Sequence, residues 1–336
     1  MGEKESSRSR TRVVIVLTNL FSLACLVWTI RDAHLGELRD RLVSMNWSWV
    51  AVAVVANLAV YFWQGVRWRL VLRPVAGISF LRVARAIYVG LFANEVLPLR
   101  AGEVLRCYLV TRWTGLPFSV SLASGLIERI FDGIWLCLCF IFALRFTPMP
   151  PELRYLVDAG YVLGFAVLGG AVVLGVAMFR HQRVPADPPR QGWRRRFAVL
   201  LADLGLIGHS RYLAVAFLQS LPYLLLQVIP IWASFLGYGL PGLNLRAAFT
   251  LMVILRLSSA VPQAPGNVGL FQFLTKESLE RIFHLPAAEA AGFSLVLWGI
   301  VTLPLLAAGA VALDVTGAKI SELNRAAQQE VGRLKS

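Results

Sequence analysis

Six stretches of this 336-residue chain are predominantly apolar and at least about 18 residues long, the length that an α-helix needs to cross a bilayer. They are Val13–Ile30, Trp47–Val66, Ser119–Leu144, Val157–Phe179, Tyr212–Leu236 and Ala288–Leu313. The first run follows a basic flank, but it is long for a signal-peptide core, so we interpret it as a retained helix. The pattern predicts an all-α polytopic membrane protein with six full spans.

Two further apolar segments are interrupted near their middle. Phe80–Leu97 is followed by Glu103–Leu116, and Leu245–Val261 is followed by Val268–Leu285. Proline and glycine at each interruption stop a helix from continuing. We predict two re-entrant helical hairpins, over residues 80–116 and 245–285. Counting each arm as a short span gives eight spans with the same parity.

The two interruptions repeat one pattern at an offset of 164 positions. Pro98 and Gly102 recur as Pro262 and Gly266, with the same spacing inside each pair. In the first copy Gly102 permits a positive φ, and the second copy adds further helix-breaking residues, Pro265 and Gly269. Each copy follows two spans and precedes a third, so the two halves face opposite ways. The sequence therefore predicts an inverted-topology repeat, over residues 13–145 and 157–313, with a binding site near the bilayer midplane.

The positive charges give an orientation. The chain is 57% hydrophobic and 15% charged, with a mean hydropathy of +0.65 and a formal net charge of +14. Of the 33 lysines and arginines, 20 lie in four segments that share one side in this topology: residues 1–12, the connection after the second span (with Arg67), the basic linker 180–211 and the C-tail 314–336. The positive-inside rule then predicts a multi-pass protein of the cytoplasmic (inner) membrane with both termini cytoplasmic. Dispersed charge of this kind does not indicate a nucleic-acid partner.

Polar side chains at membrane depth must be paired or must face a cavity. The candidate substrate-binding residues lie in the two hairpins: Asn94, Arg100, Glu103, Arg106, Arg256 and Asn267. Two interpretations remain open for the arginines of the first hairpin. They bind a headgroup phosphate, together with amides of the helix that starts near Gly102, or they pair with Glu95, Glu103 or Glu128 and hold the hairpin shut. Arg256 is the second candidate phosphate ligand, with an ion pair to Glu128, Asp132 or Glu277 as its alternative.

Three charged residues lie inside the third span: Glu128, Arg129 and Asp132. Glu128 and Asp132 are four residues apart and therefore share a helix face. They either form ion pairs with Arg100, Arg106 or Arg256, or they act as a proton-coupling pair. The four cysteines accompany no histidine cluster and no second cysteine pair, so we predict no metal site and no cofactor.

Three motifs in order carry a family resemblance: Asn94-x-x-x-Pro98-x-Arg100-x-Gly102-Glu103-x-x-Arg106, then Glu128-Arg129-x-x-Asp132, then Pro262-x-x-Pro265-Gly266-x-x-Gly269. Together they resemble the membrane region of the lysylphosphatidylglycerol synthase/flippase family, over about residues 13–315. In bifunctional relatives this region moves aminoacylated phosphatidylglycerol between leaflets, and a separate soluble domain attaches the amino acid. Such a domain is not expected within these 336 residues, so the resemblance implies lipid movement without aminoacyl transfer.

We therefore expect a flippase-like transporter, rather than an enzyme, that moves an anionic phospholipid between leaflets. Its expected partners are membrane lipids. One alternative is an accessory membrane subunit for an enzyme of lipid or cell-envelope glycan synthesis. Another is a polytopic enzyme that acts on a lipid-linked substrate. The sequence leaves open the lipid, the direction, the energy coupling and the oligomeric state.

Overall fold

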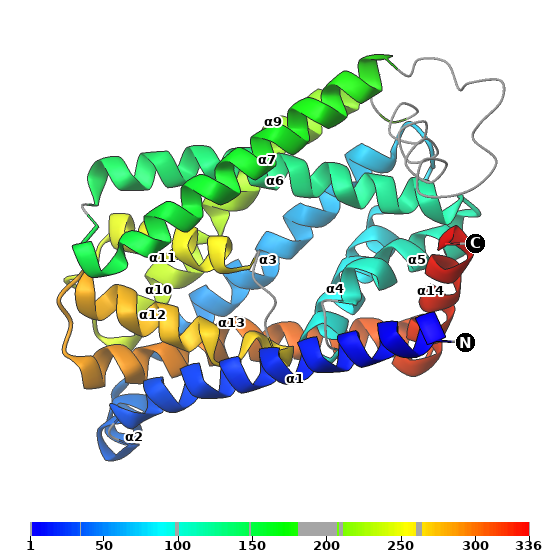
Figure 1. Cartoon of the computed structure of the whole chain (residues 1–336). Helices are drawn as coiled ribbons and strands as arrows, with labels where there is room; N and C mark the ends of the chain where they lie inside the picture. Colours follow the sequence, from blue (N-terminus) through cyan, green and yellow to red (C-terminus); the bar gives the residue numbers. More distant parts are fainter. Residues whose placement is uncertain are drawn as a thin grey trace.

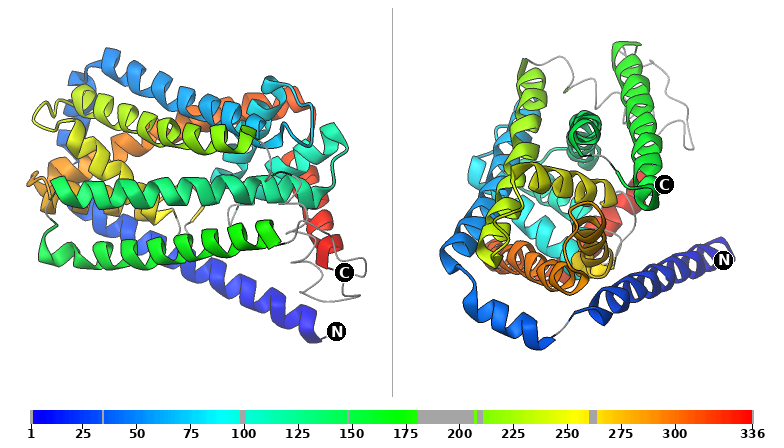
Figure 2. Two further views of the ribbon diagram at one scale, coloured as in Figure 1. Left: turned by 90° about the horizontal axis from the view of Figure 1, so that it is seen from above. Right: turned by 90° about the vertical axis from the view of Figure 1, so that its left-hand side faces the viewer.

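The computed structural model describes residues 2–33, 35–97, 101–147, 149–180, 207, 211–259 and 264–335. Within these ranges the chain consists of helices and short connections, and the all-α prediction is confirmed. The long helices run between two ends of the molecule (Figures 1 and 2). The starts of α1 and α4 and the end of α13 lie at one end, and the starts of α3, α11 and α13 lie at the other (Figure 1).

Helices cover all six apolar stretches. They are α1 (Gly2–Arg31), α3 (Trp47–Leu72), α6 (Phe118–Phe146), α7 (Arg154–Arg180), the consecutive pair α9 (Arg211–Leu226) and α10 (Val228–Tyr238), and α13 (Ala287–Thr316). Among the described residues, four segments are long and apolar enough to cross a membrane: Trp47–Leu72, Pro151–Val172, Arg211–Tyr238 and Ala287–Thr316. α1 adds a shorter apolar stretch, Val16–Arg31. The charged residues of α6, including Arg145 in its last turn, interrupt its apolar run.

Two pairs of shorter helices occupy the interrupted segments. α4 (Phe80–Val96) pairs with α5 (Gly102–Thr114), and α11 (Leu245–Ser258) precedes α12 (Leu270–Arg281), with the short 3-10 helix η3 (Pro265–Asn267) between them. At 1.5 Å per residue these four helices are about 18–26 Å long, less than the ~30 Å hydrocarbon core. The two pairs lie in opposite halves of the molecule (Figure 1), and α4 contacts η3. The described ends of both interruptions therefore meet near the middle of the bundle.

Three elements differ from the sequence expectations. α3 continues to Leu72, so Arg67 lies inside a helix and its assignment to the connection after the second span was wrong. An additional helix, α2 (Leu35–Ser44), follows α1, and a 3-10 turn, η2 (Pro151–Leu153), precedes α7. Most of the C-tail forms α14 (Ile320–Lys335), which packs against α5.

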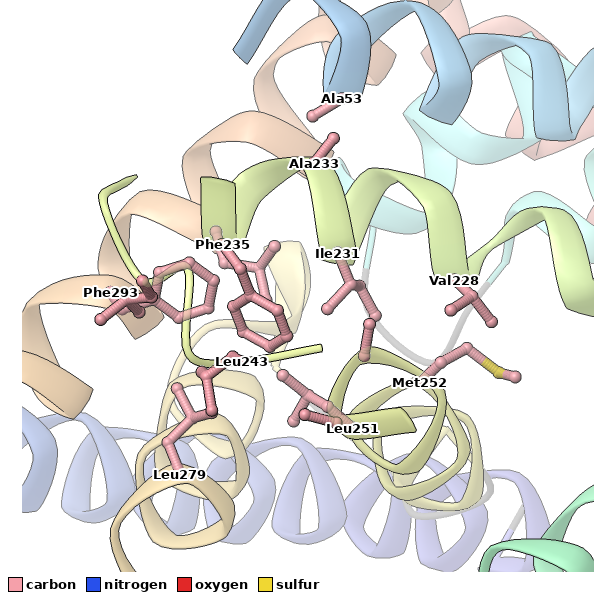
Figure 3. Packing of buried hydrophobic residues seen from close by; sticks show 14 of the residues in the cluster. Ala53, Val228, Ile231, Ala233, Phe235, Leu243, Leu251, Met252, Leu279 and Phe293 are labelled. Atoms are coloured by element: carbon pink, nitrogen blue, oxygen red, sulfur yellow. The ribbon is translucent and has the colours of Figure 1, made fainter. Parts of the chain in front are cut away.

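A hydrophobic core holds α11 in place. Figure 3 shows Ile231, Phe235, Leu251 and Met252 of α10 and α11 packed together, with Phe293 of α13 beside them. Ala53 of α3 faces Ala233 of α10 (Figure 3). Because both side chains are small, the two helices pack closely at this point. This packing fixes the start and middle of α11 and so positions the polar residues in its last turn.

Glycine serves the two interruptions in different ways. Gly102 is the first residue of α5 and does not use the positive φ that glycine permits. Instead, a Cβ on Gly102 would lie 1.8 Å from the Gly90 carbonyl oxygen, so its missing side chain lets α5 approach α4. Gly266 and Gly269 do have positive φ angles, of 75° and 95°, which L side chains rarely adopt.

Candidate functional site

Two adjoining cavities, of about 160 and 110 Å³, lie where the two interruptions meet. Both are lined by Tyr61, Glu95, Arg256 and Asn267, so we treat them as one central cavity. The smaller part is also lined by Asn94, Glu103, Arg106 and Arg129. Every predicted substrate-binding residue that the structure describes thus lies at one place. Pro98, Arg100, Pro262 and nearly all of the basic linker 180–211 lie outside the described residues.

Arg256 contributes a cation to both parts of the cavity. Its Nε donates a hydrogen bond to Gln227 Oε1, and its Nη2 donates to the Tyr223 hydroxyl at 3.1 Å. Among the described residues it forms no salt bridge, so the alternative of an ion pair with Glu128, Asp132 or Glu277 is not seen in that part of the chain. Neutral groups therefore orient this guanidinium without cancelling its charge.

The sequence analysis did not identify Gln227 and Tyr223 as residues of the site. Gln227 separates α9 from α10, within a segment that was predicted as one span, and Pro230 follows it. Proline at that position cannot donate to the carbonyl four residues earlier, which weakens the helix at the junction. The signal was therefore present, as two prolines, Pro222 and Pro230, eight positions apart in an apolar run.

Arg106 is only 3% exposed and forms ion pairs with two carboxylates, those of Glu103 and Glu128. Its Nε lies 3.0 Å from Glu103 Oε2, and its Nη1 lies 2.7 Å from Glu128 Oε2. Its guanidinium also stacks on Trp68, 4.4 Å from the ring centroid. For Arg106 this geometry favours the alternative in which the arginine pairs with Glu103 and Glu128 instead of binding a phosphate.

Arg67 completes the ion-pair network and was missed as a candidate. Its side chain is 0% exposed, and its Nη2 lies 3.0 Å from Glu128 Oε1 and 3.2 Å from Asp132 Oδ2. The two carboxylates share a face of α6, as predicted, and both reach Arg67. Arg129, 43% exposed, binds Glu103 on the cavity side. We name Arg67, Arg106, Arg129, Glu103, Glu128 and Asp132 the ion-pair network.

The ion-pair network contains equal numbers of positive and negative side chains. The ion-pair network contains three arginines and three carboxylates, so it is formally neutral. Arg256 of α11 and Glu95 of α4 also line the cavity, and Asn267 Nδ2 donates to Glu95 Oε1 at 3.2 Å. The cavity therefore contains the guanidinium of Arg256, whose hydrogen-bond partners among the described residues are neutral.

Side chains satisfy backbone groups that the interruptions release. Asn94 Oδ1 accepts from the Gly102 amide at 2.9 Å, so that amide is engaged within the protein rather than open to a phosphate. Gln272 Oε1 accepts from the Gly269 amide at 2.7 Å, and Trp298 Nε1 donates to the Gly266 carbonyl at 2.7 Å. Irregular backbone of this kind is tolerated at membrane depth where protein surrounds it.

Comparison with known proteins agrees with the motifs. The family model of the lysylphosphatidylglycerol synthase TM region matches residues 13–309. A UPF0104 membrane protein of Methanothermobacter thermautotrophicus is 26% identical over 289 residues, covering 77% of this chain and 81% of the relative. Glycosyltransferase AglD of Haloferax volcanii is 30% identical over 128 residues, which are 37% of this chain and 20% of that protein. Given the extent of the family match, the chain belongs to the lysylphosphatidylglycerol synthase TM region family.

Proposed function

We propose that the protein moves an anionic phospholipid between the leaflets of the cytoplasmic membrane, with the headgroup phosphate bound in the central cavity. The observation that carries this proposal is the position of Arg256. Its guanidinium lines a cavity between two broken helical hairpins and has neutral partners among the described residues. A guanidinium can bind a phosphate with two parallel hydrogen bonds.

The arrangement of the hairpins supports a site near the bilayer midplane. In our proposal α4–α5 enters from the cytoplasmic end, where α1 starts and α14 lies (Figure 1), and α11–α12 enters from the opposite end. Both pairs are re-entrant, and six full spans surround them. The inverted repeat then relates the two halves, and alternating access rocks or gates one half against the other.

The side chains divide the work in this proposal. Arg256 binds the phosphate, while Asn267 and Gln227 line the same cavity and offer amide groups to headgroup oxygens. The ion-pair network keeps α3, α5 and α6 together beside the cavity. The acyl chains stay in the bilayer, so the cavity has to accept the headgroup alone. The protein catalyses no covalent reaction in this scheme.

A vesicle assay tests the proposal. Purified protein is reconstituted with fluorescent phosphatidylglycerol, and chemical quenching of the outer leaflet reports movement between leaflets. We expect Arg256→Gln to abolish the protein-dependent rate and Arg39→Gln, at an exposed arginine of α2, to retain it. If lipid moves between the leaflets at the wild-type rate in vesicles containing Arg256→Gln, the proposed phosphate-binding role of Arg256 is wrong.

The match to a glycosyltransferase favours a second candidate function. In this alternative the protein is a membrane subunit that serves an enzyme of lipid-linked glycan synthesis. Affinity purification from the native membrane separates the two candidates. A glycosyltransferase that co-purifies in equal amounts, with no lipid movement by the chain alone, would support the subunit; a chain that moves lipid by itself would support the transporter.

A further inference from the structure

An apolar groove of about 540 Å³ lies outside the central cavity, between α6, α9–α10 and α11. Its lining comes from the end of α6, the α9–α10 junction and the start of α11. The main lining side chains are Phe142, Phe146, Leu225, Val228, Leu245 and Phe249. Phe142, Phe146 and Leu245 are each more than half exposed, so the groove opens on the surface of the molecule. Its volume falls in the usual range for small-ligand sites.

The uncharged polar side chains that line the groove beside its phenylalanines are hydrogen-bonded within the protein. The two hydroxyl groups, of Thr147 and Thr250, are hydrogen-bonded to each other at 2.9 Å. The Phe142 ring packs against Phe146 and Phe249, with centroids 4.6 and 5.7 Å apart. The contact between the end of α6 and the second turn of α11 therefore gives the groove defined apolar walls.

One charged side chain, Arg246 in the first turn of α11, is present in the lining that the structure describes. It is exposed and forms no salt bridge with a described residue. Arg145, in the last turn of α6, is also exposed and lines a shallow depression that shares Phe142 with the groove. Two cations thus flank an apolar surface at the end of the molecule opposite to the start of α1.

We propose that this groove binds an anionic phospholipid of the leaflet at that end, with an acyl chain along the phenylalanines and the phosphate against Arg246. The charge pattern favours a lipid, because a phospholipid joins an apolar chain to a negative group at its membrane–water end. A transmembrane helix of a partner would need no cation there. The site is separate from the central cavity: Gln227 and Arg256 line the cavity, whereas Leu225 and Arg246 line the groove.

Photolabelling tests the site with the full chain in vesicles of phosphatidylcholine containing a trace of phosphatidylglycerol that carries a diazirine on its acyl chain. We expect labelled peptides from residues 142–147 and 245–250. Arg246→Gln should lower this labelling about fivefold, the effect expected for one basic residue near an anionic headgroup. Leu225→Trp should lower it by filling the groove. The matched controls are Arg39→Gln, at an exposed arginine of α2 at the same end (Figure 1), and Leu218→Trp, at an exposed leucine of α9 that does not line the groove.

The outcomes are separable from those of the transport assay. Arg256→Gln should keep the groove labelled even where lipid movement is lost. The proposal is overturned if both groove variants label like wild type, or if diazirine-labelled phosphatidylcholine labels the groove as strongly as phosphatidylglycerol. Labelling confined to peptides of the central cavity would also overturn it, while leaving the proposed transport site intact.

Discussion

The guanidinium of Arg67 lies between two carboxylates of α6 and the ring of Tyr223, whose centroid is 4.4 Å away. It also donates to the Ser220 hydroxyl at 3.0 Å. A buried charge with this many partners is costly to remove, because the partners then stay buried without compensation. The arginine therefore connects α3, α6 and α9 through one side chain.

Replacing Arg67 with methionine should destabilise the protein strongly. Removing one partner of a buried pair typically costs about 3–5 kcal/mol, and here Glu128 and Asp132 both lose a partner. Thermal unfolding in detergent measures the loss. Arg129→Gln is the control: Arg129 is 43% exposed, so a small change is expected. Equal losses in the two variants would contradict the central role of Arg67.

Glu128→Gln distinguishes ion pairing from proton coupling. Glu128 contacts both Arg67 and Arg106, whereas Asp132 has the more exposed carboxylate of the two. Ion pairing predicts that Glu128→Gln lowers the unfolding temperature more than Asp132→Asn does, and that the folded fraction responds to pH in the lipid-movement assay as the wild type does. A variant that is stable but responds to pH differently from the wild type in that assay would favour proton coupling instead.

At the scale of single elements, the contact between α4 and α5 depends on glycine. Gly102→Ala would place a methyl group 1.8 Å from the Gly90 carbonyl, so the two helices would have to separate. We expect a loss of about 1–3 kcal/mol, the usual cost of overpacking, read from thermal unfolding. Gly170→Ala in α7 meets no atom within 4 Å and should be neutral or stabilising. A neutral Gly102→Ala would show that the helices are not in close contact.

The helices themselves were predictable because apolar length and proline–glycine breaks act locally. Trp47–Val66 and Phe80–Leu97 were placed correctly for this reason, apart from their ends. Arg67 was assigned wrongly to a connection, because a charge at the end of an apolar run usually marks a membrane boundary. Its burial against α6 depends on a segment far away in the sequence. The α9–α10 junction was missed because its hydropathy stays high across Gln227.

The sequence pattern pointed to polar residues of both interruptions as the site. It could not show which arginine would have only neutral hydrogen-bond partners. Arg106 and Arg256 look equivalent in the sequence, each beside a helix break. Packing decides between them: Arg106 lies within reach of two carboxylates, and Arg256 lies beside Tyr223 and Gln227. That difference exists only once α9–α10 is placed next to α11.

At the scale of the whole molecule, the proposed topology predicts a labelling pattern. The test uses single-cysteine variants of a chain whose four native cysteines are replaced. Gly77→Cys and Pro117→Cys flank α4–α5, and Gly242→Cys and Pro286→Cys flank α11–α12. A membrane-impermeant thiol reagent added outside should label the second pair, and the first pair should react after the membrane is opened. Labelling of one position from each pair on the same side would contradict re-entrant hairpins from opposite faces.

The neutral ion-pair network also bears on how the chain is made. Three charges near the centre of α6 make it a poor candidate for insertion by itself, since each costs about 2.5–3.5 kcal/mol at the middle of a helix. Arg67 and Arg106, which pair with the two carboxylates, and Glu103, which pairs with Arg129, precede α6 in the chain and have therefore been synthesised when it emerges. Insertion of α6 should accordingly depend on α3 and α5, so that the first half enters the membrane as an assembled unit and not helix by helix.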